Sequence, residues 1–240
     1  MKPDERGTSG GDGDRTPGAM PSFAPGSNVL VRGPSLVGKR ALALALLAAA
    51  TPDERPVALS ASRDAAGFRE RLSSAASTTV ARRCYVVDAV RSQVAGGTLA
   101  CTDGGGDPRT WYVTSPGDLT GAGMSTARAT EAAMADGGRP RLLVDNLSTL
   151  LQYNSLERLY RFLHVITGRT TDVDGVTIQL IHSDAQTERE TATLGQLFDA
   201  VVDVVLTDEG TAVRIRGSTA PGVQHLDMAD LRPPRCNLPA

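Results

Sequence analysis

Short apolar segments alternate along the chain with longer segments in which apolar residues recur every three or four positions. Short apolar runs are typical of buried strands, and the longer spacing is typical of helices packed on one side. We predict strands at 28–31, 57–60, 84–90, 141–145 and 175–184. We predict helices between and after them at 41–50, 64–74, 125–136, 156–169 and 191–201, the third starting at a cap formed by Ser125 or Thr126.

Strands that alternate with helices imply a mostly parallel sheet covered by helices on both faces. The segment 201–218 departs from this alternation, because two apolar runs flank a turn at Asp208–Gly210. The predicted fold class is therefore α/β, a mostly parallel sheet flanked by helices with a C-terminal antiparallel hairpin.

The 240 residues are enough for one sizeable core, since domains usually span roughly 100 to 200 residues. Residues 1–26 are rich in glycine, proline and charge and predict a disordered tail. We place the domain at 27–218 and an irregular C-terminal tail at 219–240. No repeat of fixed period is visible, which argues against a solenoid.

The charged residues do not change the predicted fold class or domain boundaries. Twenty-seven acidic and 25 basic side chains leave a net charge of -2. Such a balance provides no overall field to attract nucleic acid or an anionic membrane, so neither is an expected partner. Cys84, Cys101 and Cys236 are too scattered for a disulfide framework and predict reduced thiols.

Two segments of the sequence indicate where in the cell the protein is expected. Residues 1–26 lack the apolar run of a secretory signal. The apolar run 41–50 is half of the roughly 20 residues that a membrane-spanning helix needs. We therefore expect a cytoplasmic protein without a membrane segment.

A candidate phosphate-binding loop follows the first predicted strand. It has the spacing G-x-x-x-x-G-K, with Gly33, Gly38 and Lys39, and it opens a helix. Backbone N–H groups in such a loop surround phosphate oxygens, and the lysine reaches the terminal phosphates. The alternative is a glycine-rich turn without a ligand. The candidate binding residues are Gly33, Pro34, Ser35, Leu36, Val37, Gly38, Lys39 and Arg40.

Arg40 departs from the motif. Ser or Thr normally follows the lysine, and its hydroxyl ligates Mg²⁺. A guanidinium cannot ligate a metal, but it can neutralise phosphate charge that Mg²⁺ would otherwise carry. The alternative is an arginine turned to solvent. Mg²⁺ is therefore possible, but Arg40 argues against it and against efficient hydrolysis.

Asp145 ends the apolar strand "RLLVD". The ligand crevice of an open α/β sheet lies at this end of the strands. Asp145 is therefore the candidate metal residue, holding Mg²⁺ directly or through water. The alternative is a turn cap, because "DNLS" is good turn chemistry by itself.

These motifs resemble a known family. "GPSLVGKR", "YVTSPGDLTGAG", "RLLVDNLSTLL" and "VRIRGS" are similar, in order and spacing, to the RecA-fold ATPases of the KaiC-like group, whose relatives include the RadA recombinases. The resemblance covers roughly residues 27–218. It implies a RecA-like P-loop fold, ATP as the ligand and a possible homo-oligomer.

The resemblance also assigns roles outside the loop. In the family the closing triplet reaches the neighbouring subunit's nucleotide, so it implies that Arg214 and Arg216 contact ATP in trans. The alternative places both on the exposed face of an edge strand. His182, at the end of a predicted strand, would sense the terminal phosphate or else be a surface residue.

The family has acidic residues after its second strand to activate water, but this chain has Ser60, Ala61 and Ser62 there. Loss of a general base lowers the rate on the order of 10² to 10⁴-fold. We assign no catalytic residue.

We therefore predict a KaiC-like, regulatory ATP-binding protein with weak or no hydrolysis, whose bound state is read by an unidentified protein partner. The alternatives are an active ATPase with an atypical metal site, a recombinase-like DNA-binding protein and an interaction module with an empty loop. The acidic segment "SDAQTERETATL" disfavours DNA binding.

Overall fold

The computed structural model describes residues 20–90, 107–208, 210–217 and 224–227. Its strands are β1 Asn28–Gly33, β2 Glu54–Ser60, β3 Tyr85–Asp88, β4 Thr110–Tyr112, β5 Arg139–Asp145, β6 Val176–His182, β7 Ala200–Thr207, β8 Gly210–Gly217 and β9 Gln224–Asp227. Its helices are α1 Lys39–Ala48, α2 Ala65–Ala75, α3 Thr78–Arg83, α5 Leu119–Ala135, α6 Leu147–Tyr153, α7 Leu156–Thr171, the 3₁₀ helix η1 Ser183–Ala185 and α8 Glu188–Gly195.

All nine strands form one sheet in the order β4-β3-β2-β5-β6-β1-β7-β8-β9. The pairs from β4 to β7 are parallel, and β8 and β9 add an antiparallel end. This topology confirms the predicted α/β fold, including the β7–β8 hairpin. Because the sheet is parallel, the carboxyl ends of β1, β2, β5 and β6 lie at one edge, which brings the candidate site residues together.

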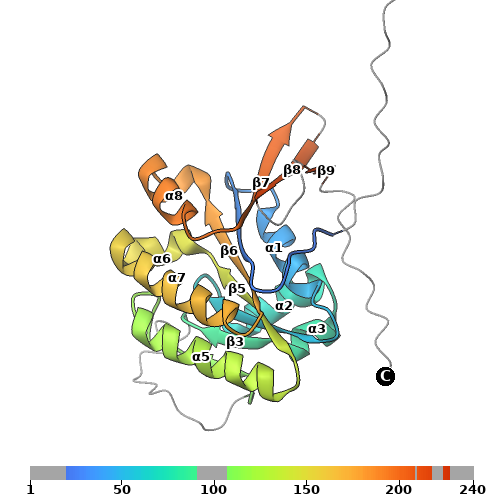
Figure 1. Cartoon of the computed structure of the whole chain (residues 1–240), viewed down its shortest axis with the longest axis vertical. Coiled ribbons are helices and arrows are strands. Elements are labelled where there is room, and N and C mark those ends of the chain that lie inside the picture. Colours follow the sequence, from blue (N-terminus) through green and yellow to red (C-terminus); the bar gives the residue numbers. More distant parts are fainter. Residues whose placement is uncertain (1–19, 91–106, 209, 218–223, 228–240) are drawn as a thin grey trace, which may run out of the picture.

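Helices cover both faces of the sheet, with α5 and α7 on one side and α1 on the other (Figure 1). Alternate residues of β1 serve the two cores: Val29 and Val31 pack on the α1 side, and Leu30 packs on the α5 side. The apolar sequence of α1 after Arg40 follows from its place, since its side chains from Leu42 to Ala48 are all buried. None of the helices in the described part of the chain could cross a membrane.

Helix α5 begins earlier than predicted. Asp118 rather than Ser125 or Thr126 caps it, accepting a hydrogen bond of 2.8 Å from the N–H of Gly121. Ser125 and Thr126 are buried in the middle of the helix. The sequence does not indicate the first turns of this helix, because Gly121 and Gly123 disfavour a helix interior. At Gly121 a Cβ would lie 2.3 Å from the Asp118 carboxylate, so glycine allows this cap.

The cap gives a direct test of where α5 starts. We expect Asp118→Ala to lower the free energy of unfolding by about 1 kcal/mol, because the Gly121 N–H would lose its partner. Ser125→Ala is the matched control and should leave stability equal or higher, since alanine favours a helix interior. Urea unfolding of both variants measures the difference, and a reversed order would mean that the helix starts at Ser125.

The region 191–201 also differs from its prediction. Helix α8 ends at Gly195, and β7 starts at Ala200 within the predicted helix. Strand pairing explains the difference, because Ala200 and Val202 lie beside Val29 and Val31 of β1 and are buried. Four valines between Val201 and Val205, interrupted only by Asp203, favour this strand.

Two segments assigned to the tails are ordered in part. Phe23 is 8% exposed and packs in the α1-side core, and the N–H of Gly26 donates to the carbonyl of Gly175 at 3.0 Å. Strand β9 lies within the segment predicted to be irregular and pairs with β8. No sequence pattern indicates either contact, because both segments are short and rich in polar residues or proline.

Candidate functional site

The loop between β1 and α1 has the geometry of a phosphate-binding turn. Gly38, the residue before α1, has φ = 85°, a left-handed conformation that suits glycine. It has no side chain to cap the helix, and the first turn of α1 contains no acidic residue. The N-terminal N–H groups of α1 are therefore not capped by a side chain of the described residues, and N–H groups at a helix N-terminus can donate to an anion.

Gly33 has a separate structural role. A Cβ at this position would lie 2.4 Å from the carbonyl oxygen of Val204, so glycine allows β7 to approach β1 here. Leu36, at the tip of the loop, is fully exposed and has φ = 65°. The strained backbone at Leu36 is of the kind that marks functional loops.

The side chain of Lys39 reaches back across the loop to Pro34. Its residue is 2% exposed, and its Nζ donates a hydrogen bond to the carbonyl of Pro34. Burial and the neighbouring charge of Arg40 lower the pKa of Lys39, while Asp184 opposes this shift. Among the described residues, the ammonium group is therefore hydrogen-bonded only to a neutral oxygen beside the loop.

Asp145 lies beside the loop, at the end of β5. The Nε of Arg40 is 3.5 Å from its Oδ1, and the hydroxyl of Ser62 donates to its Oδ2 at 2.6 Å. The Asp145 side chain is 4% exposed. The structure thus brings Lys39, Arg40 and Asp145 together, and Arg40 is turned toward the site rather than to solvent.

These contacts do not fit the Mg²⁺ ion that the fold family implies. One carboxylate oxygen of Asp145 faces a guanidinium and the other accepts from Ser62. A cation at Oδ1 would be repelled by Arg40, and residue 40 offers no oxygen ligand. Across the described residues no cluster of three or more His, Cys, Asp or Glu side chains is suited to a metal.

The segment after β2 supplies a positioning hydroxyl rather than a carboxylate. Ser62 holds Asp145, whereas Ala61 is 2% exposed and packs in the apolar core. Asp64 caps α2 by accepting from the N–H of Gly67. The buried Asp88 at the end of β3 accepts from the N–H of Ala65. Both aspartates thus have structural roles.

Asp184 is a site residue that the sequence reasoning missed. It follows β6 in η1, and its Oδ2 accepts a hydrogen bond of 2.9 Å from the N–H of Ser35. Hydrogen bonds from Ser35 lower its pKa, and Lys39 contributes to the shift. The available signal was its place just after the strand that pairs with β1.

His182 ends β6 opposite Gly33. Its backbone N–H donates to the hydroxyl of Ser148 at 3.0 Å, and its Nδ1 is buried without a hydrogen-bond partner in the described part of the structure. Burial, then Lys39 and Arg40, lower the pKa of His182. These causes favour the neutral form of the imidazole beside the loop.

Arg214 and Arg216 lie on β8, away from the loop motif in sequence and on a different strand. Arg216 forms an ion pair with Asp203 of β7, which also accepts from Arg32. Arg214 and Arg216 are both exposed, as the alternative predicts, but β8 is not the edge strand, because β9 pairs with its outer side. The trans role of both arginines stays a prediction, since it requires a second copy of the chain.

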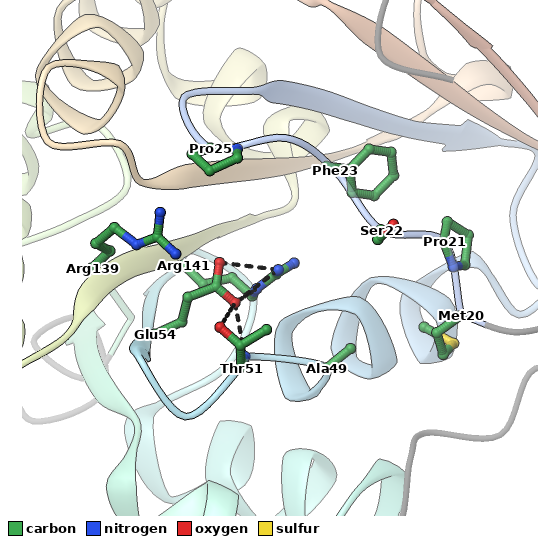
Figure 2. Close-up of a pocket in the computed structure, with 10 residues that line it drawn as sticks. All are labelled: Met20, Pro21, Ser22, Phe23, Pro25, Ala49, Thr51, Glu54, Arg139 and Arg141. Carbon is green, nitrogen blue, oxygen red and sulfur yellow. Dashed lines mark hydrogen bonds and ion pairs between the residues drawn. The ribbon is translucent and has the colours of Figure 1, made fainter. Parts of the chain in front are cut away.

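A pocket of about 590 Å³ lies at the opposite end of the sheet, beyond the last turn of α1 (Figure 2). Figure 2 shows the Met20–Pro25 segment along one wall and the Glu54–Arg141 ion pair along another. Glu54 accepts from two nitrogens of Arg141 and from Thr51, and Arg139 pairs with Asp53. The charged groups of this pocket are thus already paired.

Comparison with known proteins agrees with this fold. A family described as DUF7504, of unknown function, matches residues 26–204. The structure is similar to the KaiC-like protein PH0186 from the archaeon Pyrococcus horikoshii OT3, with a TM-score of 0.58, 15% identity and 85% of each chain covered. It is also similar to the uncharacterized protein PH0321 from Pyrococcus horikoshii, which was solved with an unknown peptide, at a TM-score of 0.59 and 13% identity over 84% of this chain and 92% of that one. No protein of curated function matches. At these identities the likeness shows the fold alone.

Proposed function

Since the chain belongs to the DUF7504 family, whose function is unknown, we infer its activity from its own residues. We propose that it binds ATP at the loop between β1 and α1 with little need for Mg²⁺. The fold, the open N-terminus of α1 and the placement of Lys39 support a nucleotide-binding, RecA-like role. Hydrolysis is slow, and another protein reads the bound state.

The ion pair between Arg40 and Asp145 is the observation that carries this proposal. In a metal-dependent site, Mg²⁺ cancels repulsion between the carboxylate and the phosphates. Here a guanidinium already cancels the charge of Asp145. The chain can therefore accept phosphates beside Asp145 without a divalent cation, and with no hydroxyl at residue 40 it has one ligand fewer for a metal that would help to drive hydrolysis.

Slow hydrolysis has a second basis in the residues after β2. Ser62, not a carboxylate, faces Asp145, and Asp64 and Asp88 bind backbone N–H groups elsewhere. Titration of the protein with labelled ATP, ADP and GTP, each with Mg²⁺ and with a chelator, tests the proposal. Binding of ATP only in the presence of Mg²⁺ would contradict it, and turnover at about 1 s⁻¹ or faster would favour the alternative of an active ATPase.

Arg40 gives the most specific test. We expect Arg40→Thr to weaken ATP binding by at least about 10-fold in chelator, since Asp145 would lose its cationic partner. Added Mg²⁺ should restore the affinity of this variant, because the threonine hydroxyl and Asp145 can then serve as metal ligands. Hydrolysis should stay slow, because no base is restored.

Arg40→Lys is the matched control, since it keeps a positive charge at residue 40 and removes only the guanidinium. Its ATP binding should remain nearly independent of Mg²⁺. Equal Mg²⁺ dependence in the threonine and lysine variants would show that the charge of residue 40 does not replace the metal.

A homo-oligomer is the setting in which Arg216 would act. It is held by Asp203 within its own chain, so contact with a neighbouring nucleotide would require it to leave that carboxylate. The motivation is the resemblance of "VRIRGS" to the KaiC-like group.

A further inference from the structure

The carboxylate of Asp184 lies where a phosphate-binding loop takes its anion. It accepts the backbone N–H of Ser35 at 2.9 Å, and it interacts electrostatically with Lys39. Ser35 belongs to the arm of the loop that leaves β1, four residues before α1 begins. The Asp184 carboxylate therefore already accepts a hydrogen bond from the part of the loop that lies farthest from α1.

Lys39 reaches the same arm. Its Nζ donates to the carbonyl of Pro34, the residue before Ser35. A phosphate chain that starts at the N-terminus of α1 and extends toward Lys39 would approach Ser35 with its last group. The last phosphate and the Asp184 carboxylate would then compete for the same donors and repel each other.

The segment that carries Asp184 can give way. None of the residues of η1 is buried, and Asp184 is exposed. Helix α8 has its own capping box, in which Thr187 and Glu190 satisfy each other's backbone N–H groups. Displacement of Asp184 thus costs little packing and leaves the start of α8 intact.

We infer that Asp184 is an internal stand-in for the terminal phosphate, which a nucleoside triphosphate has to displace and a monophosphate does not. This inference rests on the proposed nucleotide-binding function and specifies how that site distinguishes nucleotides. Asp184 therefore lowers the affinity for ATP relative to ADP and AMP.

The experiment uses the full chain and the variant Asp184→Asn, which keeps the shape of the side chain and removes its charge. Affinities for AMP, ADP and ATP are measured by calorimetry in chelator. ATP should bind about 3- to 5-fold more tightly to the variant, the scale of one screened charge pair, whereas AMP should be unchanged. The gain should shrink at high salt, because Asp184 is exposed.

Asp208→Asn is the matched control, because it makes the same substitution at an exposed position in the β7–β8 turn. It should change none of the three affinities. Asp184→Ala removes the contact altogether and should give at least the same gain for ATP.

The outcomes separate this inference from the proposed function. Equal affinities of wild type and Asp184→Asn for ATP would overturn the role of Asp184 and leave ATP binding intact. ATP binding to the variant but not to wild type would support the role strongly. If neither protein binds any nucleotide, both ideas are wrong. A loss of hydrolysis in Asp184→Asn at unchanged ATP affinity would overturn the inference and make Asp184 a general base.

Discussion

Replacing Arg141 by methionine is expected to lower the free energy of unfolding by about 3–5 kcal/mol. Arg141 and Glu54 are each 6% exposed, and two guanidinium nitrogens donate to the Glu54 carboxylate at 2.9–3.1 Å (Figure 2). Without Arg141 the carboxylate would stay buried with Thr51 as its remaining partner. A loss of this size lowers the melting temperature of a domain this long by about 6–20 °C.

Arg139 provides a matched control in the same strand. It also pairs with a carboxylate, but Asp53 is 63% exposed and Arg139 is 37% exposed. Exposed pairs contribute about 0–1 kcal/mol, so Arg139→Met should be nearly neutral. Replacing both Arg141 and Glu54 by apolar residues should recover part of the loss, because no unpaired charge remains. A similar loss in Arg139→Met and Arg141→Met would show that burial is not the cause.

Lys39→Ala is expected to weaken ATP binding by about 1.5–3 kcal/mol, or roughly 10- to 150-fold, the range for a lost hydrogen bond to a charged group. The ammonium of Lys39 donates only to the carbonyl of Pro34 in the described structure, so it is available to phosphate oxygens. Calorimetric titration with ATP in chelator measures the effect.

Folding should not suffer from this change. The pKa of Lys39 is lower in the folded protein than in the unfolded chain, chiefly because of burial. The unfolded chain therefore holds this proton more tightly, so charged Lys39 costs stability at neutral pH. Removal of this cost offsets the packing and the hydrogen bond that are lost with the side chain, so the melting temperature should change little. Arg63→Ala, an exposed change beside Ser62, is the control for charge loss at this edge. Equal ATP affinity of Lys39→Ala and wild type would place the nucleotide elsewhere.

The sequence predicted the parts of this site that depend on local spacing. The glycine loop and the strand that ends at Asp145 each follow a pattern within about ten residues, and strand periodicity places both at the carboxyl edge of the sheet. The same reasoning predicted β5, β6 and α7 closely, because their apolar runs are long and regular.

The remaining features depend on residues that are distant in sequence. The contact of Ser35 with Asp184 joins residues 149 positions apart, and that of Ser62 with Asp145 joins residues 83 positions apart. No periodicity encodes such pairs. The same holds for Arg40, because its contact with Asp145 joins α1 to the end of β5 and no local pattern distinguishes this contact from exposure to solvent. The boundaries of α5 and β7 failed for a related reason, since a cap and a strand pairing decided them.

The dipole of helix α1 extends from the loop at one end of the sheet to the pocket at the other end. Its first N–H groups face the loop, and near its other end the carbonyl of Leu46 accepts from Arg141 at 3.3 Å. Both ends of the helix dipole are thus matched when an anion is bound, by the ligand at one end and by a buried guanidinium at the other. A ligand that binds only the folded chain adds about 2.7 kcal/mol of stability at 100 times its dissociation constant. Saturating nucleotide would therefore offset much of the free energy of unfolding that is lost when Arg141 is replaced, and it would stabilise the folded state of such variants.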